Sequence, residues 1–514
     1  MAFSVLSQTP FSARFSRLCP STRQPRRLLV TLAAAAMLCL AGPAALAAEP
    51  RLPKAVAQAL ARAQVPASAV TLLVVDANGQ RPPRLSHRAG EAMNPASLMK
   101  LVTTYAALDV LGPDFVWKTN VTMDGSIQNG LLDGNMVVRG GGDPKLVVER
   151  LQALLTQVHT SGVRAIRGDI VLDRSAFSEP TANAAEFDGE PLRPYNTQPD
   201  ALLINFKTLV MTFTPDSASG RALVRTEPPL AGVRIDDSVP LLLSAPCGDW
   251  RGDLRASVDS PSRVQFLGSY ASACGERVWP SAYAEPASFA ARAIEGSWRR
   301  LGGLLTGQVR DATASELAML RSRGTLSGQT SPLRLESPSL PLLDIVRDVN
   351  KFSNNVMAQH LLLSLGLHGQ LGQTQAGTFE AGRAAAQAWW LKTLPAAAPP
   401  VLDNGSGLSR SGRISARSLA ALLQHAANSP LADALADSLP LVGVDGSMRE
   451  RAKAATGRAQ IKTGSLRDVS AVAGYAQGAS GSRYIVIGIV NHPNASAARP
   501  ALNTLIEWAV HDRK

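Results

Sequence analysis

The 514-residue sequence is poor in cysteine and in aromatic residues, and it has no apolar run of membrane-spanning length. Four cysteines do not make a disulfide scaffold, and a chain this long can bury a core without one. The basic residues form no cluster of the kind that follows nucleic-acid phosphates, and the histidines show no metal-ligand spacing. What remains is an ordinary globular composition with room for two or three domains, and no cofactor or nucleic-acid partner is expected.

The N-terminus has the pattern of a cleaved signal peptide. Five arginines and no acidic residue precede the apolar stretch 28–40, and Ala45-Leu46-Ala47 is a small-x-small cleavage site. The apolar stretch is about a dozen residues long, whereas a membrane-spanning helix needs about 20. Removal of residues 1–47 lowers the formal charge from +12 to +7. We expect a periplasmic protein without a stable membrane span, with an uncleaved N-terminal anchor as the alternative.

The cysteines support the same compartment. Cys39 lies in the leader behind the bulky Leu38, whereas a lipoprotein signal requires a small residue there. Cys247 and Cys274 remain after cleavage and are close in sequence. In an oxidising compartment such a pair is expected to form one disulfide, with two free thiols as the alternative.

Apolar periodicity changes along the chain. Residues 70–75 have the pattern of a buried strand, 98–111 have helical spacing, and helical spacing returns from 341 through 365 and over 378–391. A hairpin (469–475 and 484–490) and a helix (498–510) follow. The middle, from about 118 to 330, has short strand-like runs such as 135–139, 169–173 and 209–213, interrupted by one helical segment at 146–158. This order predicts one α/β domain built from both ends of the chain, with a β-rich region inserted into it.

Ser97-Leu98-Met99-Lys100 pairs a hydroxyl with an amine. Residues three apart share one face of a helix, and a lysine that is kept neutral can take a proton from a serine. Burial and a second nearby cation both lower the pKa of a lysine. By itself this motif is weak, because about one chance match is expected in such a chain.

Two further motifs are also weak alone. Ser353-Asn354-Asn355 begins a helical segment and offers a hydroxyl and an amide, although a simple helix N-cap explains it equally well. Lys462-Thr463-Gly464-Ser465 ends a strand-like run and offers a cation and hydroxyls suited to a carboxylate, although it also fits an ordinary strand-to-turn transition. Gly464 would let a ligand approach the backbone.

The three motifs together, in this order, are the signatures of penicillin-binding proteins and serine β-lactamases. Ser97 and Ser353 are 256 positions apart, and Ser353 and Lys462 are 109 apart. In its long first gap the chain resembles the class C low-molecular-mass penicillin-binding proteins, the D-alanyl-D-alanine carboxypeptidase/endopeptidases of the penicillin-binding protein 4 type. Five further stretches fit that family: Leu111–Phe115, Gly140–Pro144, Asp403–Arg410, Leu439–Ser447 and Gly464–Tyr475.

The resemblance implies a transpeptidase/β-lactamase-like α/β (α+β) domain with an antiparallel sheet and helices, carrying inserted mostly-β domains. On this basis residues 48–117 and 331–514 are expected to form the catalytic domain, and 118–330 the inserted region. That region is expected to hold two small domains, one at about 141–225.

The resemblance also implies the chemistry. Ser97 is the expected acylated nucleophile, Lys100 its base, Ser353 a proton relay and Asn355 the group that orients the substrate amide. Lys462, Thr463 and Ser465 would hold the substrate carboxylate beside Gly464, and Lys462 would help to keep Lys100 neutral. The expected partners are peptidoglycan stem peptides, with β-lactam antibiotics as covalent inhibitors. No metal or organic cofactor is implied.

Two other functions stay open on the sequence. A serine β-lactamase would need a dedicated deacylating group, and no class A-type Glu motif is evident between the first two signatures. A catalytically silent cell-wall-binding protein of the same fold is disfavoured because all three motifs are intact. The sequence does not decide between removal of a terminal D-alanine and cleavage of peptide crosslinks.

Overall fold

The computed structural model describes residues 52–178, 183–325, 333–369 and 376–512. The expected signal peptide, residues 1–47, lies outside these ranges. Within them, no helix combines the length and the apolar character needed to cross a membrane.

Both ends of the described chain build one antiparallel sheet. Its five strands run in the order β2-β1-β22-β21-β20, and neighbouring strands are antiparallel. They are β2 (Leu85–His87), β1 (Val70–Asp76), β22 (Arg483–Asn491), β21 (Val469–Gln477) and β20 (Ala459–Leu466). The expected hairpin is therefore present as β21 and β22. The Lys-Thr-Gly motif lies on β20, at one end of the strand order.

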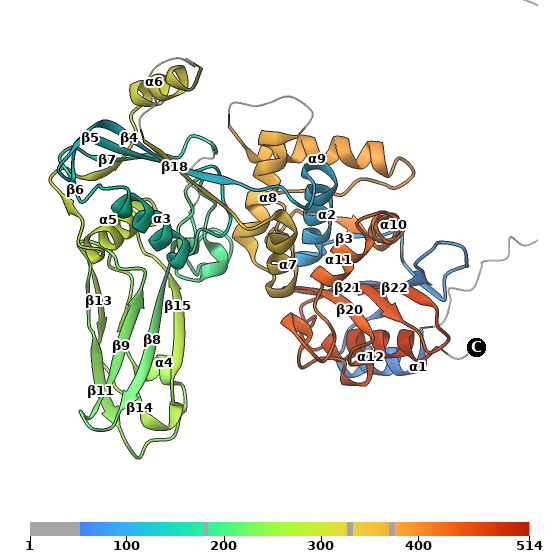
Figure 1. Cartoon of the computed structure of the whole chain (residues 1–514). Helices are drawn as coiled ribbons and strands as arrows, with labels where there is room; N and C mark the ends of the chain where they lie inside the picture. Colours follow the sequence, from blue (N-terminus) through green and yellow to red (C-terminus); the bar gives the residue numbers. More distant parts are fainter. Residues whose placement is uncertain (1–51, 179–182, 326–332, 370–375, 513–514) are drawn as a thin grey trace, which may run out of the picture. The chain divides into compact units, whose positions relative to one another are not determined.

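Alternating side chains of this sheet enter two separate cores. Leu73, Ala473 and Ile487 pack on one face with helices α2, α8, α9, α10 and α11, and Leu72, Val472 and Val486 pack on the other with α1 and α12. Figure 1 shows α1 and α12 below the sheet and the larger helical group above it. The helices are α1 (Lys54–Arg62), α2 (Met99–Leu111), α7 (Leu342–Phe352), α8 (Asn355–His368), α9 (Phe379–Thr393), α10 (Ala416–Ala427), α11 (Ala432–Ser438) and α12 (Arg499–Val510).

One long helical prediction is interrupted in the structure. The apolar spacing from 341 through 365 continues across Ser353, yet α7 ends at Phe352 and α8 begins at Asn355. Ser353 has φ 58° and ψ 36°, the left-handed conformation that non-glycine residues rarely adopt. The side chain of Asn354 accepts a hydrogen bond from Met357 N–H and caps α8. The helix-cap interpretation therefore applies to Asn354, which leaves the Ser353 hydroxyl free for another role.

The middle of the chain forms sheets of its own. A seven-stranded sheet joins β4 (Lys118–Gln128), β5 (Leu131–Arg139), β6 (Ala165–Ile166), β7 (Ile170–Asp173), β16 (Leu304–Leu305), β17 (Val309–Asp311) and β18 (Arg334–Pro338). A five-stranded sheet joins β14 (Tyr270–Ala271), β11 (Ser238–Leu242), β9 (Arg221–Glu227), β8 (Thr208–Asp216) and β15 (Arg277–Ala282). The helices α3 (Val148–Thr160) and α5 (Phe289–Arg300) pack into the same apolar core as both sheets.

Strand pairs of this region cross the bounds of the small unit expected at about 141–225. β7 lies inside that range but pairs with β5 and β17 outside it, and β8 and β9 pair with β15 and β11. Cys247 and Cys274 are joined by a disulfide with Cα atoms 4.7 Å apart, beside the five-stranded sheet. The domain bounds remain a prediction.

Candidate active site

Ser97 lies on a single 3-10 turn, η2 (Ala96–Leu98), directly before α2. The preceding Ala96 has φ 47°, so the backbone enters this turn in a strained conformation. Two glycines allow other segments to pack closely against it. A Cβ on Gly464 would lie 2.5 Å from Pro95 O, and a Cβ on Gly407 would lie 2.0 Å from Ala96 O. Neither position accommodates a side chain without displacing the backbone that carries Ser97.

Lys100 is fully buried one helical turn after Ser97. Its Nζ lies 2.9 Å from Ser97 Oγ, 2.7 Å from Asn355 Oδ1 and 2.6 Å from the Ser406 carbonyl oxygen. Burial, together with the charge of Lys462, holds the pKa of Lys100 well below its ordinary value.

These three contacts match the groups of a neutral amine. A neutral lysine amine has two N–H groups and one lone pair. The oxygens of Asn355 and Ser406 only accept, so they take the two N–H groups and leave the lone pair for the Ser97 hydroxyl proton. Lys100 is thus arranged as a base for Ser97.

Lys462 is the second buried lysine, and it contacts the second serine. Its Nζ donates to Ser353 Oγ at 2.8 Å and to the Thr463 carbonyl oxygen at 2.8 Å. Burial lowers the pKa of Lys462 to about 7. The left-handed backbone at Ser353 thus places its hydroxyl between the second amine and the cavity that Ser353 lines.

The outer edge of β20 is covered over its first residues. Val442 N–H donates to the Ala459 carbonyl and Ile461 N–H donates to the Pro440 carbonyl. Further along, Ser465 and Leu466 line a cavity of about 560 Å³. Thr463 Oγ1 lies between these two parts of the strand and donates to Ser447 Oγ at 2.8 Å.

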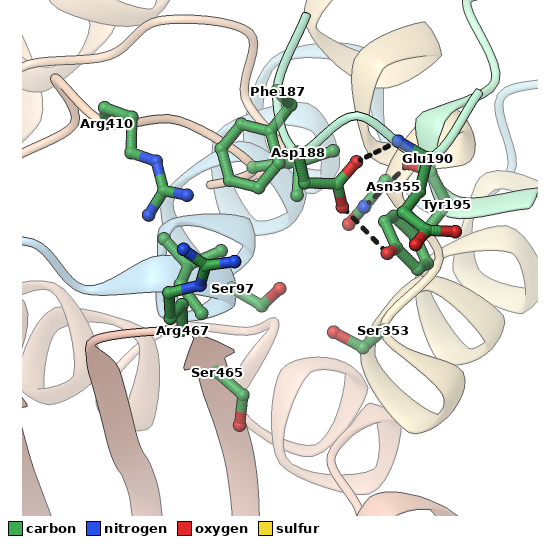
Figure 2. Close-up of a pocket in the computed structure, with 12 residues that line it drawn as sticks. Ser97, Phe187, Asp188, Glu190, Tyr195, Ser353, Asn355, Arg410, Ser465 and Arg467 are labelled. Atoms are coloured by element: carbon green, nitrogen blue, oxygen red, sulfur yellow. Dashed lines mark hydrogen bonds between the residues drawn. The ribbon is translucent and has the colours of Figure 1, made fainter. Parts of the chain in front are cut away.

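The same cavity brings Ser97, Ser353, Asn355 and Ser465 together, and Figure 2 shows Ser97, Ser353 and Ser465 around one space. Lys100 and Lys462 lie behind them, bonded to Ser97 and Ser353. Sequence reasoning did not assign the other residues of the wall: Phe187, Asp188, Glu190, Tyr195, Leu408, Arg410, Leu466 and Arg467. Two carboxylates and two guanidinium groups are among them, so the cavity suits a polar substrate with charges of both signs.

Asn355 has both ends of its side-chain amide engaged within the protein. Its Oδ1 accepts from Lys100, and its Nδ2 donates to the Tyr195 carbonyl at 3.0 Å. The sequence led us to expect an Asn355 that orients the substrate amide, and the structure adds this contact with the segment 183–200. A flipped amide would place N–H groups toward Lys100, so the Tyr195 carbonyl fixes the amide orientation that serves the base.

The described residues bring no three His, Cys, Asp or Glu side chains together in a group that could hold a metal ion. The polar groups of the cavity are hydroxyls, amines, one amide, carboxylates and guanidinium groups. Nucleophilic and acid–base chemistry is therefore what these side chains can perform themselves.

The antiparallel sheet has helices on both faces, and the Ser97–Lys100 pair lies where η2 contacts β20. These features define an active-site serine enzyme of the transpeptidase-like class. The chain belongs to the D-Ala-D-Ala carboxypeptidase 3 (S13) family, whose profile matches residues 52–511. The resemblance inferred from the three motifs is thereby confirmed, and so is the serine-type carboxypeptidase class.

Relatives extend over most of the chain. A D-alanyl-D-alanine carboxypeptidase of Actinomadura sp. (strain R39) is 29% identical over 448 residues, which are 83% of this chain and 79% of that protein. The D-alanyl-D-alanine carboxypeptidase DacB of Haemophilus influenzae is 26% identical over 403 residues, 78% of this chain and 80% of that protein.

Solved structures agree in fold. The crystal structure of penicillin binding protein 4 from Haemophilus influenzae superposes with a TM-score of 0.66 at 23% identity, covering 88% of this chain and 99% of that chain. A predatory endopeptidase of Bdellovibrio bacteriovorus superposes with a TM-score of 0.51 at 15% identity, covering 86% and 93%. The predicted fold class is confirmed.

Proposed function

We propose that this carboxypeptidase cleaves the terminal D-alanyl-D-alanine bond of peptidoglycan stem peptides through an acyl-enzyme on Ser97. One observation carries the proposal: a fully buried Lys100 Nζ lies 2.9 Å from Ser97 Oγ, and both of its N–H groups have other acceptors. A serine hydroxyl becomes an effective nucleophile when such a base is in reach.

The acylation step uses the two lysines and both serines. Ser97 Oγ bonds to the carbonyl carbon of the penultimate D-alanine while Lys100 takes its proton, and the tetrahedral oxygen becomes negative. The bond to the leaving nitrogen then breaks as that nitrogen receives a proton through the Ser353 hydroxyl, which is bonded to Lys462. D-alanine leaves, and the ester remains on Ser97. Water then attacks the ester carbonyl and gives its proton to Lys462 through Ser353, while Lys100 returns its proton to Ser97 Oγ, so that the serine and both amines are restored.

Residues of β20 supply most of the groups that we propose to bind the oxyanion and the substrate carboxylate. We assign the oxyanion to the backbone N–H groups of Ser97 and Ser465, because both residues line the cavity. Loss of one such donor typically costs about 2.7–4 kcal/mol. The substrate carboxylate is assigned to Lys462, Thr463 and Ser465, with Gly464 leaving the strand backbone accessible. A penicillin has the same arrangement of acyl carbon and carboxylate, so it is expected to acylate Ser97 and to leave slowly.

The Ser97→Ala variant tests the assignment. It should fold, release no D-alanine from a synthetic peptide that ends in D-alanyl-D-alanine, and take no label from a fluorescent penicillin. Ser217→Ala, in the exposed turn between β8 and β9 of the β-rich region, is the matched control and should behave as wild type. A labelled Ser97→Ala variant would show that another residue is the nucleophile.

Endopeptidase activity is proposed for the same cavity, because a crosslink also contains a D-alanyl carbonyl. The proposed setting is the periplasm after removal of residues 1–47, and the proposed inserted region is 118–330. Purified crosslinked muropeptides, with products read by mass, measure the balance between crosslink cleavage and D-alanine release.

A further inference from the structure

Lys100 is oriented by two acceptors, and only one of them is a side chain of the three motifs. The other is the backbone carbonyl of Ser406, at 2.6 Å. If this carbonyl moved, the amine could rotate and present an N–H instead of its lone pair to Ser97. The orientation of the Ser406 carbonyl is therefore as important to the base as the Asn355 side chain.

A compact buried turn fixes that carbonyl. Gly405 and Gly407 have φ of 75° and 77°, so the chain reverses on both sides of Ser406. Ser406 itself is fully buried. Thr103, one turn after Lys100 on α2, donates to the Gly405 carbonyl at 2.7 Å, which attaches the turn to the helix that carries the base.

The side chain of Asn404 closes this turn from within. Its Oδ1 accepts from Ser406 N–H at 3.1 Å and from Ser406 Oγ at 2.8 Å. Its Nδ2 donates to the Leu408 carbonyl at 3.0 Å, and Leu408 N–H donates to Ser406 Oγ at 3.1 Å. Both polar atoms of the Asn404 amide therefore act on this turn. Oδ1 holds Ser406, whose carbonyl meets Lys100, and Nδ2 holds Leu408, two residues further on.

We propose that Asn404 is a positioning residue for the base: its side chain holds the Ser406 carbonyl on Lys100 Nζ and thereby directs the lysine lone pair at Ser97. This inference rests on the proposed function. Asn404 does not touch the reacting atoms, so it acts only through Ser406.

The charge state of Lys100 supplies a readout that a merely structural role would not move. A carbonyl oxygen near an amine stabilises its protonated form, so a loosened Ser406 carbonyl lowers the pKa of Lys100 further. A carboxylate in place of the amide has the opposite effect. The charged groups around the base are Lys462 on β20, Asp188 and Glu190 on the cavity wall from 183–200, and Arg410 and Arg467 on the opposite wall, and all of them stay unchanged in both variants.

The experiment measures the rate of acylation by a fluorescent penicillin against pH for wild type, Asn404→Ala, Asn404→Asp and a control. Asn404→Ala should acylate about tenfold more slowly at its optimum, as expected for loss of one positioning hydrogen bond, and its acid limb should move to lower pH. Asn404→Asp keeps both acceptor contacts, loses the donor to the Leu408 carbonyl and adds a negative charge, so its acid limb should move to higher pH. The control is Asn135→Ala, because Asn135 Oδ1 also holds a backbone N–H, that of Asp169, but within the β-rich region. It should keep the wild-type profile.

Rates are divided by the folded fraction from a thermal melt, so loss of folding cannot imitate the effect. Acid limbs that coincide with wild type in both Asn404 variants would overturn the positioning role, even if Asn404→Ala were slow. If wild-type protein took no label on Ser97, the proposed function would fail instead, and the two failures are thus distinguishable. If Asn404→Ala does not fold, Thr103→Val, which releases the Gly405 carbonyl of the same turn, takes its place, and its acid limb should likewise move to lower pH.

Discussion

At the scale of single residues, the site depends on two buried amines whose hydrogen-bond partners among the described residues are neutral oxygens and not carboxylates. Lys100 and Lys462 are both fully buried and bonded to neutral oxygens. Burying a charged group is costly, so burial lowers the pKa of both amines: Lys100 stays neutral, and Lys462, with a pKa of about 7, carries its charge below about that pH. The protein therefore loses stability in order to keep a base beside Ser97, which is a familiar relation between stability and activity.

This cost can be measured by removing one amine. Lys462→Met should be more stable than wild type by about 1–4 kcal/mol at pH 6, as found when buried charges are replaced by apolar groups of similar size. The pKa of Lys462 is lowered to about 7 in the folded protein, so between that pH and about 10.5 the unfolded chain binds more protons. Stability of the wild type consequently rises with pH through this window, and its deficit against Lys462→Met should shrink.

Chemical denaturation at pH 6 and pH 10 measures both differences. Lys392→Met, at an exposed position of α9, is the control and should show neither the gain nor its pH dependence. A variant less stable than wild type at pH 6 would contradict the cost assigned to Lys462. We also expect Lys462→Met to lose acylation, because Ser353 loses its proton source.

The sequence predicted the side chains that we propose as catalytic, and the structure brings them together, but the sequence did not predict the backbone groups beside them. Ser97, Lys100, Ser353 and Lys462 belong to short motifs whose residue types carry the chemistry. The Ser406 and Tyr195 carbonyls carry no such signature, because every residue has a carbonyl. Asp188 and Arg467 lie in segments far apart along the chain, and only folding brings them to one cavity.

At the scale of elements, the close approach of β20 to η2 brings the Lys-Thr-Gly strand to Ser97. Gly464→Ala should disrupt it, because its Cβ would lie 2.5 Å from Pro95 O. Overpacking of this kind costs about 1–3 kcal/mol, and a displacement near 1 Å lowers a catalytic rate by about 10²-fold. We therefore expect acylation to fall by about two orders of magnitude while the protein still folds.

The matched control is Gly90→Ala, where an added Cβ meets nothing within 4 Å and φ is not in the left-handed region. Penicillin acylation and a thermal melt are measured on both variants. Equal acylation by Gly464→Ala and Gly90→Ala would show that the strand does not need this close approach.

Most long elements were predictable from apolar spacing. The helix expected at 498–510 is α12 (Arg499–Val510), and the strand expected at 70–75 is β1 (Val70–Asp76). A helix start at Ser353–Asn355 was predicted from the motif, but the left-handed turn at Ser353 was not, because the apolar spacing that fixes the core face continues on both sides of it. The change of direction comes from one left-handed serine, and serine has no sequence signal for that conformation.

At the scale of the whole molecule, the β-rich region has its own covalent link. The disulfide Cys247–Cys274 closes 27 residues within it, and a loop of that size is worth about 3 kcal/mol by loop-closure entropy. The Cys247→Ser/Cys274→Ser variant should therefore exchange amide hydrogens faster across residues 239–282. Its rate of penicillin acylation should equal that of wild type, because no cysteine lies in the cavity wall.

Hydrogen exchange read by mass spectrometry and acylation measured on the same sample test both parts. Protection unchanged across 239–282 would mean that the disulfide does not stabilise this region. A large fall in acylation would mean that the region acts on the base.

The division of the β-rich region was the least predictable part of the fold. Several of its strands are short, such as β6 and β16 with two residues each, and parallel pairs such as β7 with β17 join residues more than a hundred positions apart. Such pairings leave no local pattern, so an expectation of one unit at about 141–225 could not anticipate the sheets. The two ends of the chain were easier, because their strands are long and buried on both faces.

The proposed mechanism depends most on Ser97 being the residue that a penicillin acylates, with slow hydrolysis of the resulting ester. Its most direct test is to incubate wild-type protein with benzylpenicillin, measure the intact mass over time, and map the adduct by peptide mass spectrometry. We predict one penicilloyl group per chain, on the peptide that contains Ser97, persisting for many minutes. An adduct on another residue, no adduct, or rapid catalytic turnover of the antibiotic as in a β-lactamase would contradict the account.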